Sequence, residues 1–190
     1  LGLNPIPVSA ETIAIQNILV LVQQTGAQVH LCRLSSAAGI ELVRQAKQQG
    51  LPVSCDVSVY HLHLTDNDIG FFDSAYHLIP PLRSVSDRAA IWEGLQDGTI
   101  DAICSDHTPV DADEKLRPFA ESAAGATGLE LLFPLVWRWA EMQNIPFNLA
   151  LNKITYAPAQ LLGIKAGQLA IGGHADICIV NPKQEWQVSA

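Results

Sequence analysis

Basic residues are scarce in this sequence, which has 11 Lys and Arg against 19 Asp and Glu in 190 residues. The formal net charge is -8, and the basic residues are scattered along the chain without forming a cluster. A basic patch is what usually holds a protein to nucleic acid or to an anionic membrane surface. The composition therefore argues against both as partners. Solubility is a sufficient explanation of the acidic charge.

Cysteine is also scarce, and none of the four cysteines stands in a CxxC spacing. Each lies inside an apolar run that reads as a strand, which favours small core residues over disulfides or a thiolate zinc site. Unpaired thiols of this kind are typical of the reducing cytoplasm, where we expect the protein to be found. The four positions are Cys32, Cys55, Cys104 and Cys178.

Long apolar runs are missing as well: none approaches the roughly 18 residues of a membrane span, and no signal-peptide pattern opens the chain. No repeat of ~20–50 residues and no low-complexity segment is present. The first residues read LGLNPIPVSAET, with neither an initiator Met nor a strand. We therefore expect a fragment or a processed product of a longer protein.

What the chain does contain is 48% hydrophobic residues, arranged as strands that alternate with helices. Strands are predicted over 27–34, 53–59 and the apolar run from Asp101, with a helix before each. Such alternation implies parallel strands joined by right-handed crossovers, as in a barrel or a doubly wound sheet. Further helices are expected over 128–143 and 147–156, and GQLAIGGHADICIV from Gly167 has the pattern of a β-hairpin.

The stretch Asp101 to Pro109, DAICSDHTP, places Asp106 where a strand gives way to a loop. Such strand ends are where α/β folds keep their chemistry, although a buried salt-bridge carboxylate explains the pattern equally well. On the preceding strand, the face that carries Ser54, Asp56, Ser58 and Tyr60 is expected to look inward. The long connection over 61–85 predicts a lid or a binding loop.

Three stretches together resemble the dihydroorotases of the amidohydrolase superfamily: HLCRLSSAAGIELVRQAKQQGLPV, PPLRSVSDRAAIWEGLQDGTIDAICSDHTP and GQLAIGGHADICIVNP. The resemblance covers nearly the whole chain. It implies an α/β fold, the second half of a (β/α)₈ TIM-type barrel over 1–163, followed by C-terminal strands of a small β-sandwich over 164–190. It also implies an enzyme that reversibly closes carbamoyl aspartate to dihydroorotate with a binuclear zinc site, in which Asp106 matches the proton shuttle.

One metal ligand of that family is replaced here. The family motif HVS supplies a histidine ligand at the end of the sixth strand, and this chain has Arg33 in RLS. A guanidinium is a permanent cation without a free lone pair, so it cannot ligate zinc. The resemblance places the family's other ligands upstream of Leu1, so no metal is expected in this chain, although active members use zinc.

The substrate contacts implied by the resemblance are altered in the same direction. The family's NPPLR and DHAPH appear here as IPPLR and DHTPV, so Ile79 and Val110 stand where an asparagine and a histidine meet the substrate. Arg83 and His107 remain as candidate substrate-binding residues. Hydrogen bonding that fixes a loop is the expected alternative for Arg83, and hydrogen bonding near the strand end for His107.

The paired histidines of the family's TPHHL are reduced in this chain to VYHL, in which Tyr60 replaces the first and His61 retains the second. His61 and His63 form an HxH pair, a spacing that metalloenzymes use. After a tyrosine, however, the pair reads more readily as loop or helix-start residues. We also expect Arg33 to pair with Asp106 where the metal would sit, because a buried carboxylate without zinc needs a partner.

Three functions follow from these observations. The first is a non-catalytic dihydroorotase homologue that, by resemblance, acts as a scaffold for aspartate carbamoyltransferase. The second is an active zinc-dependent dihydroorotase whose remaining ligands lie in a missing N-terminal half, and the third is a small-molecule binding module. Because three strands leave unpaired sheet edges, we expect self-association or pairing with the missing half.

Overall fold

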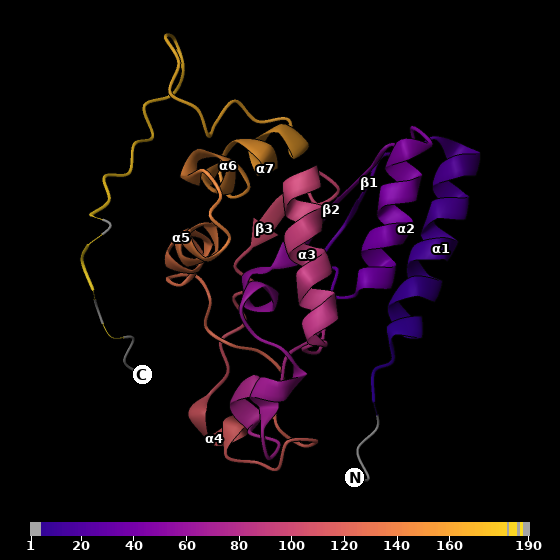
Figure 1. Ribbon diagram of the computed structural model, residues 1–190, viewed down its shortest axis with the longest axis vertical. Helices are drawn as coiled ribbons and strands as arrows, with labels where there is room; N and C mark the ends of the chain where they lie inside the picture. Colours follow the sequence, from indigo (N-terminus) through magenta and orange to yellow (C-terminus); the bar gives the residue numbers. More distant parts are fainter. Residues whose placement is uncertain (1–4, 182, 186, 188–190) are drawn as a thin grey trace.

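A three-stranded parallel sheet forms the centre of the computed structural model, which describes residues 5–181, 183–185 and 187. Strands β1 (Val29–Leu31), β2 (Val53–Ser58) and β3 (Ala102–Cys104) lie side by side in the order of the sequence (Figure 1). Val29 pairs with Val53 in register, and Ser58 pairs with Cys104. The predicted α/β class with parallel strands is therefore confirmed, and the carboxyl ends of all three strands meet at one edge.

Helices connect and cover the strands. The α-helices of the described residues are α1 (Val8–Thr25), α2 (Ala37–Gln48), α3 (Val85–Asp97), α4 (Ala112–Lys115), α5 (Leu132–Met142), α6 (Phe147–Asn152) and α7 (Tyr156–Leu161). Three short 3₁₀ helices, η1 (Val59–Leu62), η2 (Asp66–Ile69) and η3 (Ser74–Tyr76), follow β2. The predicted helix over 147–156 ends at Asn152, and the separate helix α7 begins at Tyr156.

The helix boundaries follow local signals in the sequence. The Ser36 hydroxyl accepts a hydrogen bond from the Gly39 amide at 3.0 Å and so caps α2. Gly26 and Gly98 end α1 and α3 in the left-handed conformation, at φ 69° and 84°, which glycine adopts without steric cost.

The two faces of the sheet differ in polarity. Cys55 and Val57 on β2 are fully buried together with Ile40 and Val43 of α2. Asp56, on the opposite face of β2, is only partly buried. One face is therefore the dry, helix-covered side, and the other carries the polar groups that were expected to look inward.

Glu11 on α1 fixes the chain where it leaves β1. Its carboxylate accepts hydrogen bonds from the backbone amides of Ser35 and Ser36 at 2.9 and 3.0 Å, and from both hydroxyls at 2.5 and 2.6 Å. Both serines are fully buried. A carboxylate at the start of α2 also interacts favourably with the helix dipole. Because these hydrogen bonds fix the backbone at Ser35 and Ser36, they also help to position the neighbouring Arg33.

The predicted C-terminal hairpin is not formed: the described residues after 163 contain no strand. Their apolar side chains are largely exposed, among them Leu169 at 82% and Ile179 at 95%. Two short strands need a third strand or a helix to pack on, and a cavity separates the tail from the nearby helices α5 and α6. Figure 1 shows this segment in yellow, extending away from the sheet.

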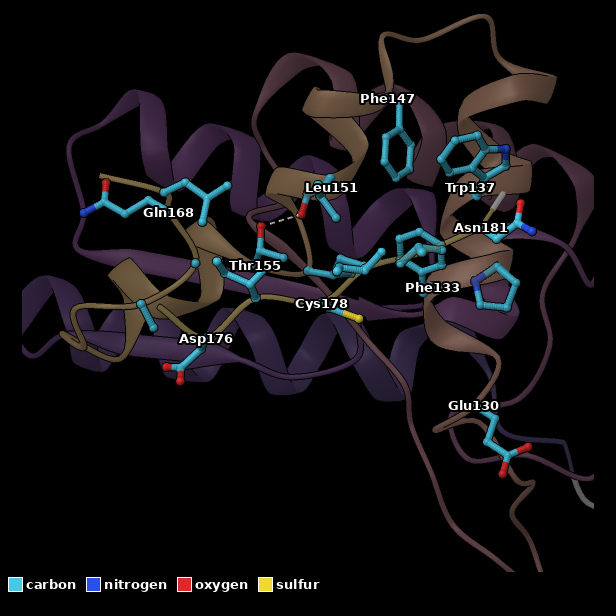
Figure 2. Close-up of a pocket in the computed structure, with 18 of the residues that line it drawn as sticks. Glu130, Phe133, Trp137, Phe147, Leu151, Thr155, Gln168, Asp176, Cys178 and Asn181 are labelled. Carbon is cyan, nitrogen blue, oxygen red and sulfur yellow. Dashed lines mark hydrogen bonds between the residues drawn. The ribbon is translucent and has the colours of Figure 1, made fainter. Parts of the chain in front are cut away.

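A cavity of about 950 Å³ lies between this tail and helices α5 and α6. Figure 2 shows Phe133, Trp137 and Phe147 lining it on the helix side, with Cys178 of the tail below them in this view. The Trp137 and Phe147 ring centroids are 4.1 Å apart. The cavity belongs to the outer helices and does not coincide with the carboxyl ends of the strands.

The expectation that all four cysteines lie in the core is wrong for two of them. Cys55 is buried and Cys104 is half-buried, but Cys32 and Cys178 are exposed. Cys32 follows β1 on the polar face of the sheet, and Cys178 lies in the tail. Among the described residues, no helix has the length and apolar character needed to cross a membrane.

Candidate functional site

An ion pair bridges the carboxyl ends of β1 and β3. The Arg33 guanidinium donates from Nη1 to Asp106 Oδ1 at 2.9 Å, which confirms the predicted pairing. The Asp106 side chain is only 7% exposed, whereas that of Arg33 is 43% exposed. The carboxylate is therefore shielded from solvent, and the arginine reaches it from the open side of the sheet.

Both residues of this pair have unusual backbone geometry. Arg33 has φ 57° and Asp106 has φ 48°, in the left-handed region that residues other than glycine seldom adopt. Such conformations cost roughly 1 kcal/mol or more and concentrate where side chains must be aimed at a site. The fold thus holds the two side chains toward each other at the end of the sheet.

Further hydrogen bonds fix Arg33 in place. Its backbone amide donates to Asp56 Oδ1 on β2 at 2.7 Å, and its Nη1 also donates to the Ile79 carbonyl at 3.2 Å. The hydrogen bond to Asp106 raises the pKa of the Arg33 guanidinium, which stays charged. Arg33 therefore ties together all three strands and the loop that carries Ile79.

The side chains of the three histidines singled out in the sequence, His61, His63 and His107, lie within hydrogen-bonding distance of backbone carbonyl or amide groups. His61 is buried and its Nε2 lies 3.1 Å from the Pro81 carbonyl, while His63 Nε2 lies 2.9 Å from the carbonyl of Leu135. Burial lowers the pKa of both imidazoles. His107 Nδ1 accepts from two backbone amides at 3.1 and 3.2 Å, so its expected hydrogen-bonding role near the strand end is confirmed.

Tyr60 fills the position next to Asp106 where the resemblance implies a histidine. Its hydroxyl is buried without a hydrogen-bond partner, and burial together with the Asp106 charge raises its pKa to about 12. Gly128 packs against this ring, since a Cβ there would meet the Tyr60 hydroxyl and the Ser105 carbonyl. A neutral phenol therefore stands beside the carboxylate.

The remaining predicted site residues lie around the same end of the sheet. Arg83 donates from Nη1 to the Ile6 carbonyl at 2.6 Å and from Nε to Ser35 Oγ at 3.1 Å, so its loop-fixing hydrogen bonds are confirmed. The Ile79 side chain is 55% exposed, and Val110 is half-buried. Contact of these residues with a substrate stays a prediction.

The long connection over 61–85 packs on the segment 115–122, which follows β3. His77 Nδ1 lies 2.9 Å from Ser122 Oγ, and the His77 ring stacks on Phe119 with centroids 4.7 Å apart. The Lys115 ammonium also lies 3.0 Å from the Ser74 carbonyl. The two loops therefore form one unit beside the strand ends.

The residues at the strand ends do not fit the zinc site that the resemblance implies. Asp106, which matches the family's carboxylate, already pairs with a permanent cation. Zinc needs lone pairs from several ligands, whereas Arg33 supplies none. His61, the retained histidine, is engaged through Nε2 with the Pro81 carbonyl.

A second cluster of chemically reactive groups was missed from the sequence. His30, Cys32 and Asp56 each offer a potential ligand atom, and these atoms lie within 4.8 Å of one another. The signal was present in the period-two alternation, which puts His30 and Cys32 on one face of the first strand. Asp56 was expected on the inward face of the neighbouring strand. The sequence alone does not show that this face lies beside His30 and Cys32.

Comparisons with known proteins show the family to which the chain belongs. The amidohydrolase family model matches residues 9–190, and the chain belongs to this family. The solved L-hydantoinase (dihydropyrimidinase) from Arthrobacter aurescens superposes with a TM-score of 0.81 at 29% identity, covering 89% of this chain and 39% of that enzyme. The α/β sheet with its helices is therefore an amidohydrolase fold.

The curated relatives narrow the resemblance within the family. A dihydroorotase-like protein of Pseudomonas aeruginosa is 44% identical over 183 residues, which is 96% of this chain and 43% of that protein. The dihydroorotase of Geotalea daltonii is 37% identical over 190 residues, or 100% of this chain and 45% of that protein. The chain is thus a dihydroorotase-like amidohydrolase that spans less than half the length of these relatives.

Proposed function

We propose that this chain is part of a dihydroorotase-like protein that does not catalyse ring opening and instead holds aspartate carbamoyltransferase in its working assembly. The observation that carries the proposal is the 2.9 Å ion pair between Arg33 and Asp106. It puts a fixed positive charge where a metal ligand would stand, and it occupies the carboxylate that would move the proton. Neither zinc-bound hydroxide nor a free base is supported at this position.

Changes around the ion pair support the same function. Ile79 and Val110 offer no polar group where the resemblance implies substrate contacts, and Tyr60 offers a neutral phenol beside Asp106. Each change removes a group that would bind an anionic ring or a metal. Several losses at one end of the sheet favour a fold that has been retained for its surface.

The open sheet supports an assembly role. In the part of the chain that the structure describes, β1 and β3 each pair with β2 alone, so both outer edges of the sheet are free. Free edges are normally covered by another strand. We propose that this chain forms the second half of a (β/α)₈ barrel and that an N-terminal half completes it. The greater length of the relatives supports this proposal. Pairing of the free edges with a second copy of this chain is the alternative.

An active zinc-dependent dihydroorotase is the second candidate. The retained Asp106 and the curated dihydroorotase relatives favour it. In that case the other ligands come from an N-terminal half, and Arg33 has to leave Asp106 when the ion binds. This candidate requires that the pair breaks readily.

Co-purification tests the scaffold. The full chain is expressed with a tagged catalytic chain of aspartate carbamoyltransferase, and the tagged protein is purified. Transferase activity is then compared between cells that contain the full chain and cells that lack it. We expect a stoichiometric complex and a loss of transferase activity on deletion. Absence of a complex, with transferase activity unchanged, would rule out the scaffold.

A further inference from the structure

Three side chains with different donor atoms converge on the polar face of the sheet. His30 lies on β1, Cys32 follows the end of β1, and Asp56 lies on β2. An imidazole nitrogen, a thiol sulfur and a carboxylate oxygen come within 4.8 Å of one another. These three atom types are the usual protein ligands of zinc.

Hydrogen bonds already hold these side chains. His30 Nε2 lies 2.9 Å from Asp56 Oδ2, a contact that the ion would replace, while His30 Nδ1 is held 2.8 Å from Ser54 Oγ. The other carboxylate oxygen, Asp56 Oδ1, accepts from the Arg33 amide at 2.7 Å. Outer hydrogen bonds of this kind orient an imidazole and a carboxylate toward a shared ion.

We propose that His30, Cys32 and Asp56 bind one divalent cation of the zinc class, with a water molecule as the fourth ligand. Tetrahedral zinc sets its ligand atoms about 3.3–3.8 Å apart, given bond lengths of about 2.0–2.3 Å. The widest present separation of 4.8 Å then closes by roughly 1 Å. The exposed side chain of Cys32 can provide this movement by rotation about its Cα–Cβ bond.

The charges balance when the ion binds. A deprotonated Cys32 and the Asp56 carboxylate contribute two negative charges, a neutral His30 contributes none, and the ion contributes two positive charges. The Asp56 side chain is 13% exposed and that of His30 is 33% exposed, and the N-terminal half proposed above would cover this face further, so the ion would be shielded from solvent. The proposal does not depend on whether the protein catalyses ring opening.

Cobalt substitution tests the site, because Co²⁺ occupies zinc sites and reports a bound thiolate by a charge-transfer band in the near ultraviolet. The full chain is titrated with Co²⁺ under reducing conditions. We expect one Co²⁺ per chain with this band, loss of the band in Cys32→Ser, and at least about tenfold weaker binding in His30→Gln and Asp56→Asn. Cys178→Ser, which removes another exposed thiol, is the matched control and should keep the band.

Three results would overturn the proposal. The charge-transfer band could be absent, it could persist in Cys32→Ser, or it could disappear in Cys178→Ser. Binding that is lost in Asp106→Asn but unaffected by Cys32→Ser would place the ion at the strand ends and would equally refute the site. Far-ultraviolet circular dichroism of each variant separates lost binding from lost folding, and Cys32→Ala serves as a second thiol-free variant.

Discussion

Replacing Arg33 by methionine removes the cation that faces Asp106 while keeping an unbranched side chain of similar reach. Removing one partner of a fully buried pair costs about 3–5 kcal/mol. Fully exposed pairs contribute about 0–1 kcal/mol. Because Asp106 is 7% exposed but Arg33 is 43% exposed, solvent screens part of the interaction. We expect the free energy of unfolding to fall by about 1–2 kcal/mol.

A double-mutant cycle isolates this interaction. Urea unfolding of the full chain is followed for the parent, Arg33→Met, Asp106→Asn and the double variant, and the coupling energy is obtained from the four unfolding free energies. Arg117→Met is the matched control, because Arg117 makes an exposed pair with Glu114 at 2.8 Å. It should change stability by less than about 0.5 kcal/mol.

The cycle can refute the structural argument. A coupling energy below about 0.3 kcal/mol would mean that the guanidinium does not compensate the shielded carboxylate. A more stable Arg33→Met protein would mean that the pair opposes folding, in which case some other group has to explain why Asp106 tolerates its buried position. Either result would remove the main support for the proposed function.

Three further predictions concern stability. Glu11→Gln should lower the unfolding free energy by about 1–2 kcal/mol in urea, because the charged acceptor of four hydrogen bonds becomes neutral; an unchanged midpoint would contradict this. Burial lowers the pKa of His61 and His63, so in acid the unfolded chain binds more protons than the folded protein, and the free energy of unfolding decreases as the pH is lowered. With an unfolded histidine pKa of about 6.5, the loss between about pH 7.5 and about 5.5 is at most about 1.4 kcal/mol per histidine, and a double glutamine variant whose stability depends on pH as strongly as that of the parent would argue against it. Gly94→Ala should cost about 1–3 kcal/mol, because a Cβ would lie 2.9 Å from the Ile100 side chain, and an unaltered urea midpoint would show that the neighbours adjust.

Much of the fold could be predicted from local signals. Apolar runs separated by helical segments predicted the three parallel strands, and the structure shows that Ser36 caps the start of α2 and Gly98 ends α3. The C-terminal hairpin was predicted wrongly because alternation and a Gly-Gly turn describe only the local preference. Whether such a segment pairs depends on a neighbouring sheet, which the sequence pattern of the segment does not contain.

The candidate site was predictable where a single chemical fact decided the outcome. A guanidinium has no lone pair, and a shielded carboxylate needs a partner, so the contact between Arg33 and Asp106 could be expected. The left-handed backbone at both residues could not, since neither is glycine. The cluster of His30, Cys32 and Asp56 depends on the register between β1 and β2, which brings together residues 24 or more positions apart and is fixed only in the folded sheet.

The most direct test of the central claim is the interconversion of dihydroorotate and carbamoyl aspartate by the intact polypeptide that carries this chain. The assay is run with added zinc and compared with the Asp106→Asn variant at equal concentration. If the Arg33 cation excludes zinc chemistry at the strand ends, the parent protein shows no turnover above that of the variant. Turnover at rates ordinary for enzymes, of about 1 per second or more, that disappears in Asp106→Asn would contradict the account.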